Sequence, residues 1–448
     1  MKVKLGYDVR DEPEEYRWIL DGCGSERFKL DLIDISRAHF NGKPNEDTFI
    51  ELPPERRRPG VCGKLLTNMY GTRGAAMAWE KEYSEKLKAW GFTRGSSSSC
   101  LFVHRERKIA LMVHGDDFIT LGCDGDLDWF LGCMKSVYQC KHVGRIGPDA
   151  HDEKHLKVLN RLVTWQDDAV EIEADQRHAE LIIQGLGLER GNGVTSPGEK
   201  EGAAYADEDP LEDELKTPFR AMAARLNFLA QDRPELLYSA KEVCRQMASP
   251  TRGAWARLKR VGRFLKQHPR VVQRFRFQDL PSHIDVCVDS DWAGCKTTRK
   301  STSGGSIQLG GHTIKCWSTT QAVISLSSGE AEYYAMLKGA SLGSGVRAML
   351  DDLELFLDLK MYSDSKAARG IVKRRGLGKT RHVAVCYLWL QDKVAAKELE
   401  IASVKGTENP ADLMTKYVGN CEIVKCWGKL GCVPREGRHR AMPSLTRG

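Results

Sequence analysis

Two adjacent carboxylates, Asp116 and Asp117, stand where two apolar runs of the sequence meet. Ile109–Val113 and Phe118–Leu121 are rich in β-branched and aliphatic residues, and Gly115 gives the backbone freedom that a tight reversal needs. The pattern predicts a β-hairpin with both aspartates at its tip. Two like charges side by side repel, which favours a bound cation. An ordinary surface turn is the other interpretation, because Gly-Asp is common turn chemistry.

A third carboxylate, Asp34, follows the short apolar run Leu30–Ile33. Between it and the hairpin, residues 65–92 have a Gly-rich entry and then apolar residues at helical spacing, namely Trp79, Tyr83, Leu87 and Trp90. An isolated aspartate, a segment with YG, A and AW, and a hairpin with paired aspartates occur in this order. The order resembles the reverse transcriptase of copia-type LTR retrotransposons and implies a palm-like region over residues 1–165.

By this resemblance, three carboxylates would be catalytic and would hold two Mg²⁺ (or Mn²⁺) ions about 3.5–4 Å apart, the spacing used for in-line phosphoryl displacement. They are Asp34, Asp116 and Asp117. The family's hairpin usually reads Tyr-Val-Asp-Asp, whereas His114 and Gly115 precede the pair here. Only 33 residues precede Asp34, where the family has a much longer fingers subdomain. We therefore expect truncated fingers and weak or absent DNA synthesis.

The last third of the sequence alternates predicted strands and helices, each with an acidic residue near one end. In chain order, the elements are a strand within Ile284–Cys295, two strands joined at Gly310-Gly311, a helix capped by Ser328, a strand and helix within LFLDLKMYSDSKAARGIV, and a strand, loop and helix start within LEIASVKGTENPADLMTK. The acidic residues are Asp289, Glu332, Asp364 and Asp412. Each alone would mean little, since acidic residues at such positions are usually solvated or capping.

The motifs around these residues are DSDWAG, RKSTSG, AEY, SDS and NPADLMTK, and they resemble the copia-type ribonuclease H. The resemblance implies a ribonuclease H fold in which the four carboxylates are catalytic and bind two divalent ions at the scissile phosphate of an RNA strand. Oxygen ligands suit Mg²⁺ or Mn²⁺. The motif match leaves Glu330 and Asp291 outside the set. Cellular relatives have a histidine shortly before the last aspartate, and Val404–Asn409 contains none, so proton transfer to the leaving group would rely on water.

A strongly basic helix is predicted within RGAWARLKRVGRFLKQHPRVVQRFRF. One stripe is apolar and consists of Trp255, Leu258, Val261 and Leu265. The remaining faces hold Arg257, Lys259, Arg260, Arg263 and Lys266. Two interpretations stay open: a solvated face on a core helix, or a face that follows nucleic-acid phosphates and releases their counterions.

A second basic segment, residues 379–382, resembles the family's RTKHI segment. The resemblance implies that Lys379, Arg381 and His382 contact the backbone of a bound hybrid. The other interpretation is a basic helix start on the surface.

Between the two motif regions, residues 156–182 alternate apolar and polar residues before turning helical, which predicts strands that close the palm and then a helix. Residues 198–217 are acidic and poor in large apolar side chains, as in a solvated linker. Residues 219–251 have helical periodicity that breaks at Arg233-Pro234. We interpret 166–280 as a connection or thumb-like helical region.

Composition sets the remaining bounds. The 448 residues are 41% hydrophobic and 29% charged, as in ordinary globular proteins, and the net charge of +7 is modest. Fourteen cysteines without paired spacing are typical of reduced intracellular thiols, and Cys421, Cys426, Cys432 and His439 match no zinc pattern. The N-terminus has no apolar signal region and no run is long enough to span a membrane. We expect a cytoplasmic or nuclear protein that is not secreted.

These observations predict a mixed α/β and α+β chain derived from a copia-type Pol polyprotein. It would contain a palm-like region (1–165), a connection region (166–280), a ribonuclease H-like domain (281–420) and a tail (421–448). The expected activity is hydrolysis of the RNA strand in RNA–DNA hybrids. The expected partners are the hybrid, an RNA template and a DNA primer, with deoxynucleoside triphosphates if the polymerase is active. The alternative is a catalytically inactive or domesticated remnant that only binds nucleic acid.

Overall fold

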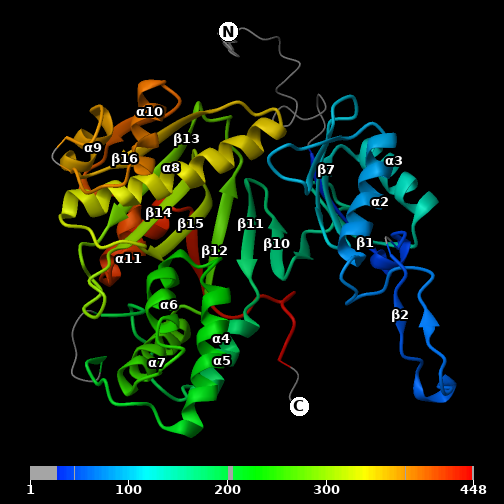
Figure 1. Cartoon of the computed structure of the whole chain (residues 1–448), viewed down its shortest axis with the longest axis horizontal. Helices are drawn as coiled ribbons and strands as arrows, with labels where there is room; N and C mark the ends of the chain where they lie inside the picture. Colours follow the sequence, from blue (N-terminus) through cyan, green and yellow to red (C-terminus); the bar gives the residue numbers. More distant parts are fainter. Residues whose placement is uncertain (1–27, 45, 200–204, 379, 446–448) are drawn as a thin grey trace. The chain divides into compact units, whose positions relative to one another are not determined.

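The computed structural model describes residues 28–44, 46–199, 205–378 and 380–445 (Figure 1). The chain is a mixed α/β protein with several sheets and divides into two compact units. Unit 1 covers the described residues as far as Leu156 together with Ala348–Phe356, and unit 2 covers Lys157–Arg347 and the residues from Leu357 onward. No helix among the described residues is long and apolar enough to cross a membrane.

Unit 1 is built on a six-stranded sheet with the order β4-β5-β6-β7-β1-β8. Its strands are β1 (Lys29–Ile35), β4 (Thr93–Arg94), β5 (Leu101–His104), β6 (Ile109–His114), β7 (Asp117–Gly122) and β8 (Cys140–Ile146). Its helices are α2 (Ala75–Ala89) and α3 (Asp124–Val137). A two-stranded hairpin, β2 (Phe49–Ile50) with β3 (Gly63–Lys64), and two 3₁₀ helices, η3 (Ala38–Asn41) and η4 (Pro54–Arg56), lie between β1 and α2.

Both helices of unit 1 pack on the same face of this sheet. Ile33 of β1 and Phe118 of β7 are paired across the strands and belong to the same buried cluster as Trp79 of α2 and Phe130 of α3. The apolar stripe predicted for residues 79–90 is therefore confirmed as core, with its last member only partly buried at the helix end. Burial of these large apolar groups is the main force that holds the sheet and helices together.

Unit 2 contains a five-stranded sheet with the order β18-β12-β11-β10-β9. Its strands are β9 (His155–Val158), which begins at the end of unit 1, β10 (Arg161–Trp165), β11 (Ala169–Ala174), β12 (Arg270–Arg276) and β18 (Cys432–Arg435). The prediction that residues 156–174 close the palm sheet is wrong, because β11 pairs with β12 and not with any strand of unit 1. Alternating apolar residues indicate a strand and its buried face but do not identify its partner.

Helices of unit 2 share a buried cluster beside that sheet, and they are α4 (Arg177–Gly185), α5 (Asp213–Leu229), α6 (Leu237–Cys244) and α7 (Arg252–Gln267). The predicted break at Arg233-Pro234 is confirmed, since α5 ends at Leu229 and a 3₁₀ helix, η6 (Pro234–Leu236), precedes α6. Helix α5 begins at Asp213, inside the segment that was expected to be a solvated linker. Three acidic residues at this start, Glu212 to Glu214, face the positive end of the helix dipole, which favours them there.

A second sheet of unit 2 has the order β15-β14-β13-β16-β17. Its strands are β13 (His283–Ser290), β14 (Thr302–Leu309), β15 (His312–Thr320), β16 (Asp358–Ser363) and β17 (Glu400–Ser403). Strands β13, β14 and β15 are antiparallel, whereas β16 is parallel to both β13 and β17. The predicted hairpin at Gly310-Gly311 is confirmed, and Gly310 has the positive φ (58°) that such a turn requires.

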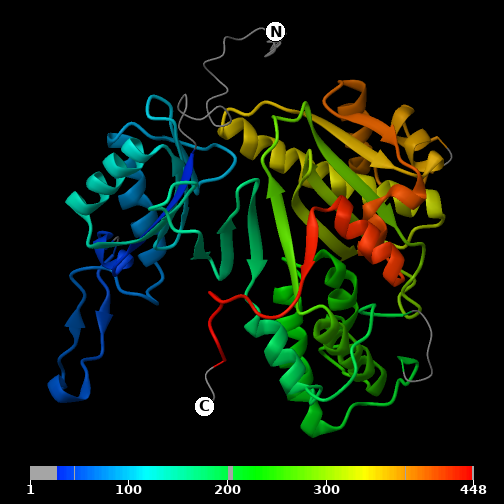
Figure 2. The same cartoon turned by 180° about the vertical axis from the view of Figure 1, so that it is seen from behind.

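Helices lie on both faces of this sheet (Figures 1 and 2). They are α8 (Ser328–Asp352), α9 (Lys366–Lys373), α10 (Trp389–Ala395) and α11 (Asn420–Lys429), with short 3₁₀ helices η7 (Val385–Leu388), η8 (Gly406–Glu408) and η9 (Pro410–Met414). Helix α8 approaches the sheet closely through Gly339, where a Cβ atom would lie 2.5 Å from the Val288 side chain. A larger residue at this position would therefore push α8 away from β13.

Candidate functional site

Two of the predicted carboxylates lie side by side because their strands are parallel neighbours. Asp289 is near the carboxyl end of β13, and Asp364 directly follows β16. The register pairs Cys287 with Tyr362, so positions 289 and 364 are level two residues further along each strand. Carboxyl ends of neighbouring parallel strands are common sites for ligands in α/β proteins.

Glu332 reaches the same place from the start of α8. The predicted N-cap is one residue off: the Ser327 hydroxyl, not that of Ser328, accepts the backbone N–H of Glu330 at 3.2 Å. The Glu330 carboxylate in turn accepts the backbone N–H of Leu326, the residue before the N-cap, at 3.0 Å. Together, these two bonds fix where α8 begins and therefore where Glu332 lies.

The buried Gln321 joins this helix start to the strand that carries Asp289. Its Nε2 atom donates to the carbonyl of Ala331 at 2.8 Å and to the hydroxyl of Ser290 at 3.1 Å. Ala331 precedes Glu332 and Ser290 follows Asp289, so one side chain links the Ala331 carbonyl to the Ser290 hydroxyl, next to two of the carboxylates. No local sequence pattern predicts this role, which depends on tertiary contacts.

The three carboxylates form a compact group of oxygen ligands. Asp289, Glu332 and Asp364 each offer an oxygen atom within 4.8 Å of the others. The Oε2 atom of Glu332 is buried and has no hydrogen-bond partner. A buried carboxylate oxygen without a partner is costly, and a hard cation in this position would satisfy it. The group therefore fits a divalent metal ion.

The pKa values of two of these groups rise strongly. Burial, the neighbouring charge of Asp412 and then that of Asp364 raise the pKa of Asp289 to about 7, against the lowering effect of a hydrogen bond from Thr415. Burial followed by the charges of Asp289 and Asp364 raises the pKa of Glu332 to about 9. Without a cation, the site therefore retains protons near neutral pH.

The fourth carboxylate, Asp412, lies beside this group but outside the set within 4.8 Å. It is in η9, whose N-cap Asn409 accepts the backbone N–H of Ala411 at 3.1 Å. The Lys416 ammonium lies 2.8 Å from Asp412 Oδ1. Burial alone would lower the pKa of Lys416, but its hydrogen bond with Asp412 and the charges of Asp289, Asp412 and Asp364 raise it.

Two further contacts seat the segment that carries Asp412. The Thr415 hydroxyl donates a short hydrogen bond to Asp289 Oδ2. Gly304 of β14, which pairs with Asp289, leaves room for this segment, because a Cβ atom there would lie 2.6 Å from the Thr415 methyl group. The last predicted motif is thus packed directly against the first.

Two acidic residues that the motif match excludes have other partners. Glu330 is buried, and besides capping α8 it accepts the hydroxyl of Tyr334 at 3.0 Å and lies 2.8 Å from His382 Nε2. Asp291 accepts a short hydrogen bond from the backbone N–H of Thr302. Their carboxylates are therefore used in local structure.

In unit 1, the predicted hairpin of β6 and β7 is confirmed, with Gly115 and Asp116 as the two turn residues. Asp117 begins β7 and pairs with Asp34 of β1 across the sheet. The indole N–H of Trp79 donates to the Gly115 carbonyl at 2.8 Å and ties helix α2 to the turn. The structure thus brings Asp34 and Asp117 together as cross-strand neighbours.

The hairpin carboxylates are less tightly gathered than those of unit 2. Burial, then the charges of Asp116 and Asp34, raises the pKa of Asp117. Among the described residues, however, Asp34, Asp116 and Asp117 do not form a group of ligand atoms within 4.8 Å. The support for a metal ion is therefore weaker here.

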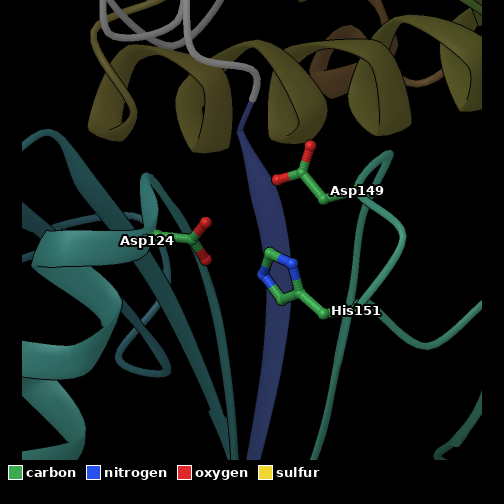
Figure 3. Close-up of side chains that lie close together, drawn as sticks. All are labelled: Asp124, Asp149 and His151. Carbon is green, nitrogen blue, oxygen red and sulfur yellow. The ribbon is translucent and has the colours of Figure 1, made fainter.

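A different group of unit 1, which sequence reasoning missed, does lie within 4.8 Å: Asp124 at the start of α3, with Asp149 and His151 from the loop after β8 (Figure 3). The Lys29 ammonium lies 2.5 Å from both aspartates and 3.0 Å from Asp152. An internal cation thus already pairs with the carboxylates of this cluster. Its members are scattered along the chain without a shared motif, so the sequence offered no signal for it.

The predicted basic helix is α7, and most of its basic side chains contact the chain itself. Arg257 donates to the Tyr205 carbonyl at 3.0 Å and Arg260 to the Ser196 hydroxyl at 3.0 Å. Arg263 donates to the Asn192 carbonyl at 2.9 Å, and Lys266 donates to the carbonyl oxygens of residues 188 and 189. The Lys259 ammonium lies over the Trp255 ring, 5.5 Å from its centroid. These contacts hold the segment before α5 onto α7.

The second basic segment is only partly described. Lys379 lies outside the described residues, Arg381 is exposed, and His382 pairs with Glu330 as stated above. In the tail, Cys426 and Cys432 are buried whereas Cys421 is exposed. These cysteines and His439 form no group of candidate metal ligands in the described part of the chain.

The carboxylate group at the strand ends defines a candidate metal-dependent site. Comparison with known proteins shows that the chain is homologous to Pol polyproteins of retrotransposons. It is 23% identical over 429 residues to the retrovirus-related Pol polyprotein from transposon TNT 1-94 of Nicotiana tabacum and 25% identical over 430 residues to that from transposon RE1 of Arabidopsis thaliana. These matches cover 92% and 93% of the chain but only 31% and 28% of the relatives. The resemblance predicted from the motifs is confirmed.

A shorter match reaches higher identity. An uncharacterized mitochondrial protein of Arabidopsis thaliana, AtMg00810, is 35% identical over 121 residues, which are 26% of the chain and 49% of that protein. No family model matches the chain.

Proposed function

We propose that unit 2 hydrolyses the RNA strand of RNA–DNA hybrids and that its second sheet has the ribonuclease H fold. The observation that carries this proposal is the group of Asp289, Glu332 and Asp364 within 4.8 Å, in which Glu332 Oε2 is buried without a partner. The strand order with an antiparallel hairpin and two parallel strands, and homology to Pol polyproteins, support it.

In this proposal, Asp289, Glu332, Asp364 and Asp412 hold two Mg²⁺ (or Mn²⁺) ions. When bound, such ions supply Lewis acidity for an attacking water and for the leaving oxygen of the phosphodiester. The chain's own groups keep the ligands in place: Thr415 orients the carboxylate of Asp289, and Gln321 links the Ser290 hydroxyl, beside Asp289, to the Ala331 carbonyl, beside Glu332. Preorganised ligands reduce the cost of rearrangement during the reaction.

The palm-like region is proposed to be a degenerate reverse transcriptase. Asp34 and Asp117 are cross-strand neighbours, which fits the predicted site, but the three carboxylates are not gathered within ligand distance of one another. An RNA template, a DNA primer and deoxynucleoside triphosphates would be its substrates only if the site closes on binding them. We expect weak or absent primer extension.

A second candidate function is nucleic-acid binding without turnover, as in a domesticated remnant. One observation favours it: Asp412 lies outside the group within 4.8 Å and is paired with Lys416. The basic residues proposed for contact with the hybrid backbone are Arg381, His382 and the exposed parts of α7, together with Lys379. Binding of a hybrid without cleavage in Mg²⁺ or Mn²⁺ would identify this alternative.

The test is metal-dependent cleavage of an end-labelled RNA–DNA hybrid by the purified chain. Asp364→Asn keeps size and removes one ligand charge, so cleavage should fall by several orders of magnitude. The metal-free melting temperature should stay unchanged or rise, because carboxylate repulsion falls. Asp358→Asn makes the same change at the other, exposed end of β16 and should cleave at the wild-type rate. Equal cleavage by Asp364→Asn and wild type would refute the assignment.

A further inference from the structure

Lys416 is the chain's own cation at the proposed metal site. Among the described residues, Asp412 alone of the four carboxylates has an ion pair with a basic side chain, and that partner is Lys416 at 2.8 Å. The side chain of Lys416 is 40% exposed, so its ammonium can leave the pair toward solvent without repacking the core.

The ion pair involves the one proposed metal ligand that lies outside the compact group of carboxylates. Asp289, Glu332 and Asp364 lie within 4.8 Å of one another, and Asp412, held by Lys416, is outside that set. The neighbouring residue Thr415 contacts Asp289 directly, so the backbone that carries both partners is already fixed against the site. Recruitment of Asp412 therefore needs side-chain movement only.

We propose that Lys416 competes with the divalent cation for Asp412 and so acts as a positioning residue of the site. This inference rests on the proposed metal-dependent function. In the metal-free chain, the ammonium offsets part of the repulsion among four carboxylates. A bound cation takes over that role, and the Asp412 oxygen exchanges its ammonium partner for the metal.

This role has an unusual signature. A lysine that merely supports the fold would, when removed, lower stability with and without metal and weaken metal binding. A competing lysine gives opposite signs: the metal-free protein becomes less stable, because carboxylate repulsion is less compensated, and the cation binds more tightly. The Lys416 side chain is 40% exposed, so solvent screens most of the repulsion between its charge and a divalent ion, and we expect about tenfold tighter binding.

The experiment measures Mg²⁺ affinity by isothermal titration calorimetry and melting temperature in chelator and in Mg²⁺. Lys416→Met keeps the apolar stem and removes the charge, and it should bind Mg²⁺ about tenfold more tightly with a lower metal-free melting temperature. Lys416→Arg keeps the charge and should bind no more tightly than wild type. Lys425→Met is the matched control, since it removes a surface lysine paired with Glu408 at 2.6 Å and should leave the affinity within twofold of wild type.

The outcomes separate this inference from the function on which it rests. If wild type binds Mg²⁺, Asp364→Asn loses binding and Lys416→Met binds equally or more weakly, competition is refuted and the metal site stands. If wild type and Asp364→Asn are equally unable to bind Mg²⁺, both the site and the competition fail. Should Lys416→Met not fold, Lys416→Gln replaces it under the same expectations.

Discussion

The side-chain amide of Asn409 donates a hydrogen bond of 2.8 Å to the carbonyl oxygen of Val288. Val288 is the residue before Asp289, and Asn409 also caps the 3₁₀ helix that carries Asp412. One buried side chain therefore joins the first and the last of the four acidic motifs. It sets the distance between Asp289 and Asp412 independently of any metal ion.

This link predicts the effect of Asn409→Ala. The change removes a cap and leaves the Val288 carbonyl without this partner, so we expect a loss of about 1–3 kcal/mol in the free energy of unfolding. Metal affinity should also fall, because Asp412 is no longer anchored. Urea unfolding and Mg²⁺ titration measure the two effects. Asn420→Ala, at an exposed helix start in the same unit, should be close to wild type in both.

Metal-free stability should depend on pH in a defined sense. The ordinary pKa values of Asp289 and Glu332 are 3.8 and 4.5, and burial with neighbouring carboxylates raises them in the folded chain to about 7 and about 9. Between pH 4 and pH 9, roughly, the folded state thus binds more protons than the unfolded state. The stability that these two groups contribute to the folded state is therefore lost as pH rises from about 4 to about 9.

Melting temperatures measured in chelator across this pH range test the effect. Glu332→Gln should flatten the decline, since the amide has no proton to lose, and saturating Mg²⁺ should do the same in the wild type. Glu398→Gln, in an exposed ion pair with Lys393, is the control and should keep the wild-type slope. An identical slope for Glu332→Gln and wild type would contradict the raised pKa.

The palm-like site should show little primer extension, because its carboxylates are not gathered within ligand distance of one another. The measurement is extension of a labelled DNA primer on an RNA template in Mg²⁺ and in Mn²⁺. Processive synthesis that Asp116→Asn abolishes and Asp126→Asn, at a helix start in the same unit, leaves intact would show that this expectation is wrong.

Arg260 should matter for stability more than for nucleic-acid binding. Its side chain is 16% exposed and contacts Ser196, Tyr205 and Glu199, so Arg260→Met should cost about 1–3 kcal/mol of unfolding free energy. The slope of log affinity for hybrid against log salt should not change. The Lys259 ammonium only covers the Trp255 ring. If α7 contacts nucleic-acid phosphates, Lys259→Met should have little effect on stability but should reduce the slope of log affinity against log salt by about one.

Much of the second sheet of unit 2 could be predicted from sequence. A strand before Asp289, a two-residue hairpin at Gly310-Gly311 and a helix bearing Glu332 have strong local signals, since strand alternation, turn glycines and capping residues act over a few positions. The capping residue itself was displaced by one, from Ser328 to Ser327, because adjacent serines are equivalent until the helix register is fixed.

Other features depended on contacts that local patterns do not encode. Strand β11 pairs with β12 about a hundred residues later, and only the packed fold decides between that partner and the palm sheet. The charges of α7 were visible in sequence, but the carbonyl oxygens that they bind were not. Likewise, Lys416 is one lysine among many until the structure brings Asp412 beside three other carboxylates.

The cluster around Lys29 has a consequence for how the chain unfolds. Hydrogen bonds from Lys29 and Arg145 outweigh burial and lower the pKa of Asp124, and a hydrogen bond from Lys29 lowers the pKa of Asp149. Unit 1 therefore loses this support in acid, whereas the carboxylate site of unit 2 is least favourable in alkali without metal. Denaturation should therefore show two transitions, one for each unit, and their order should reverse between acid and alkaline solution. A single two-state analysis would then give a wrong free energy of unfolding for both units.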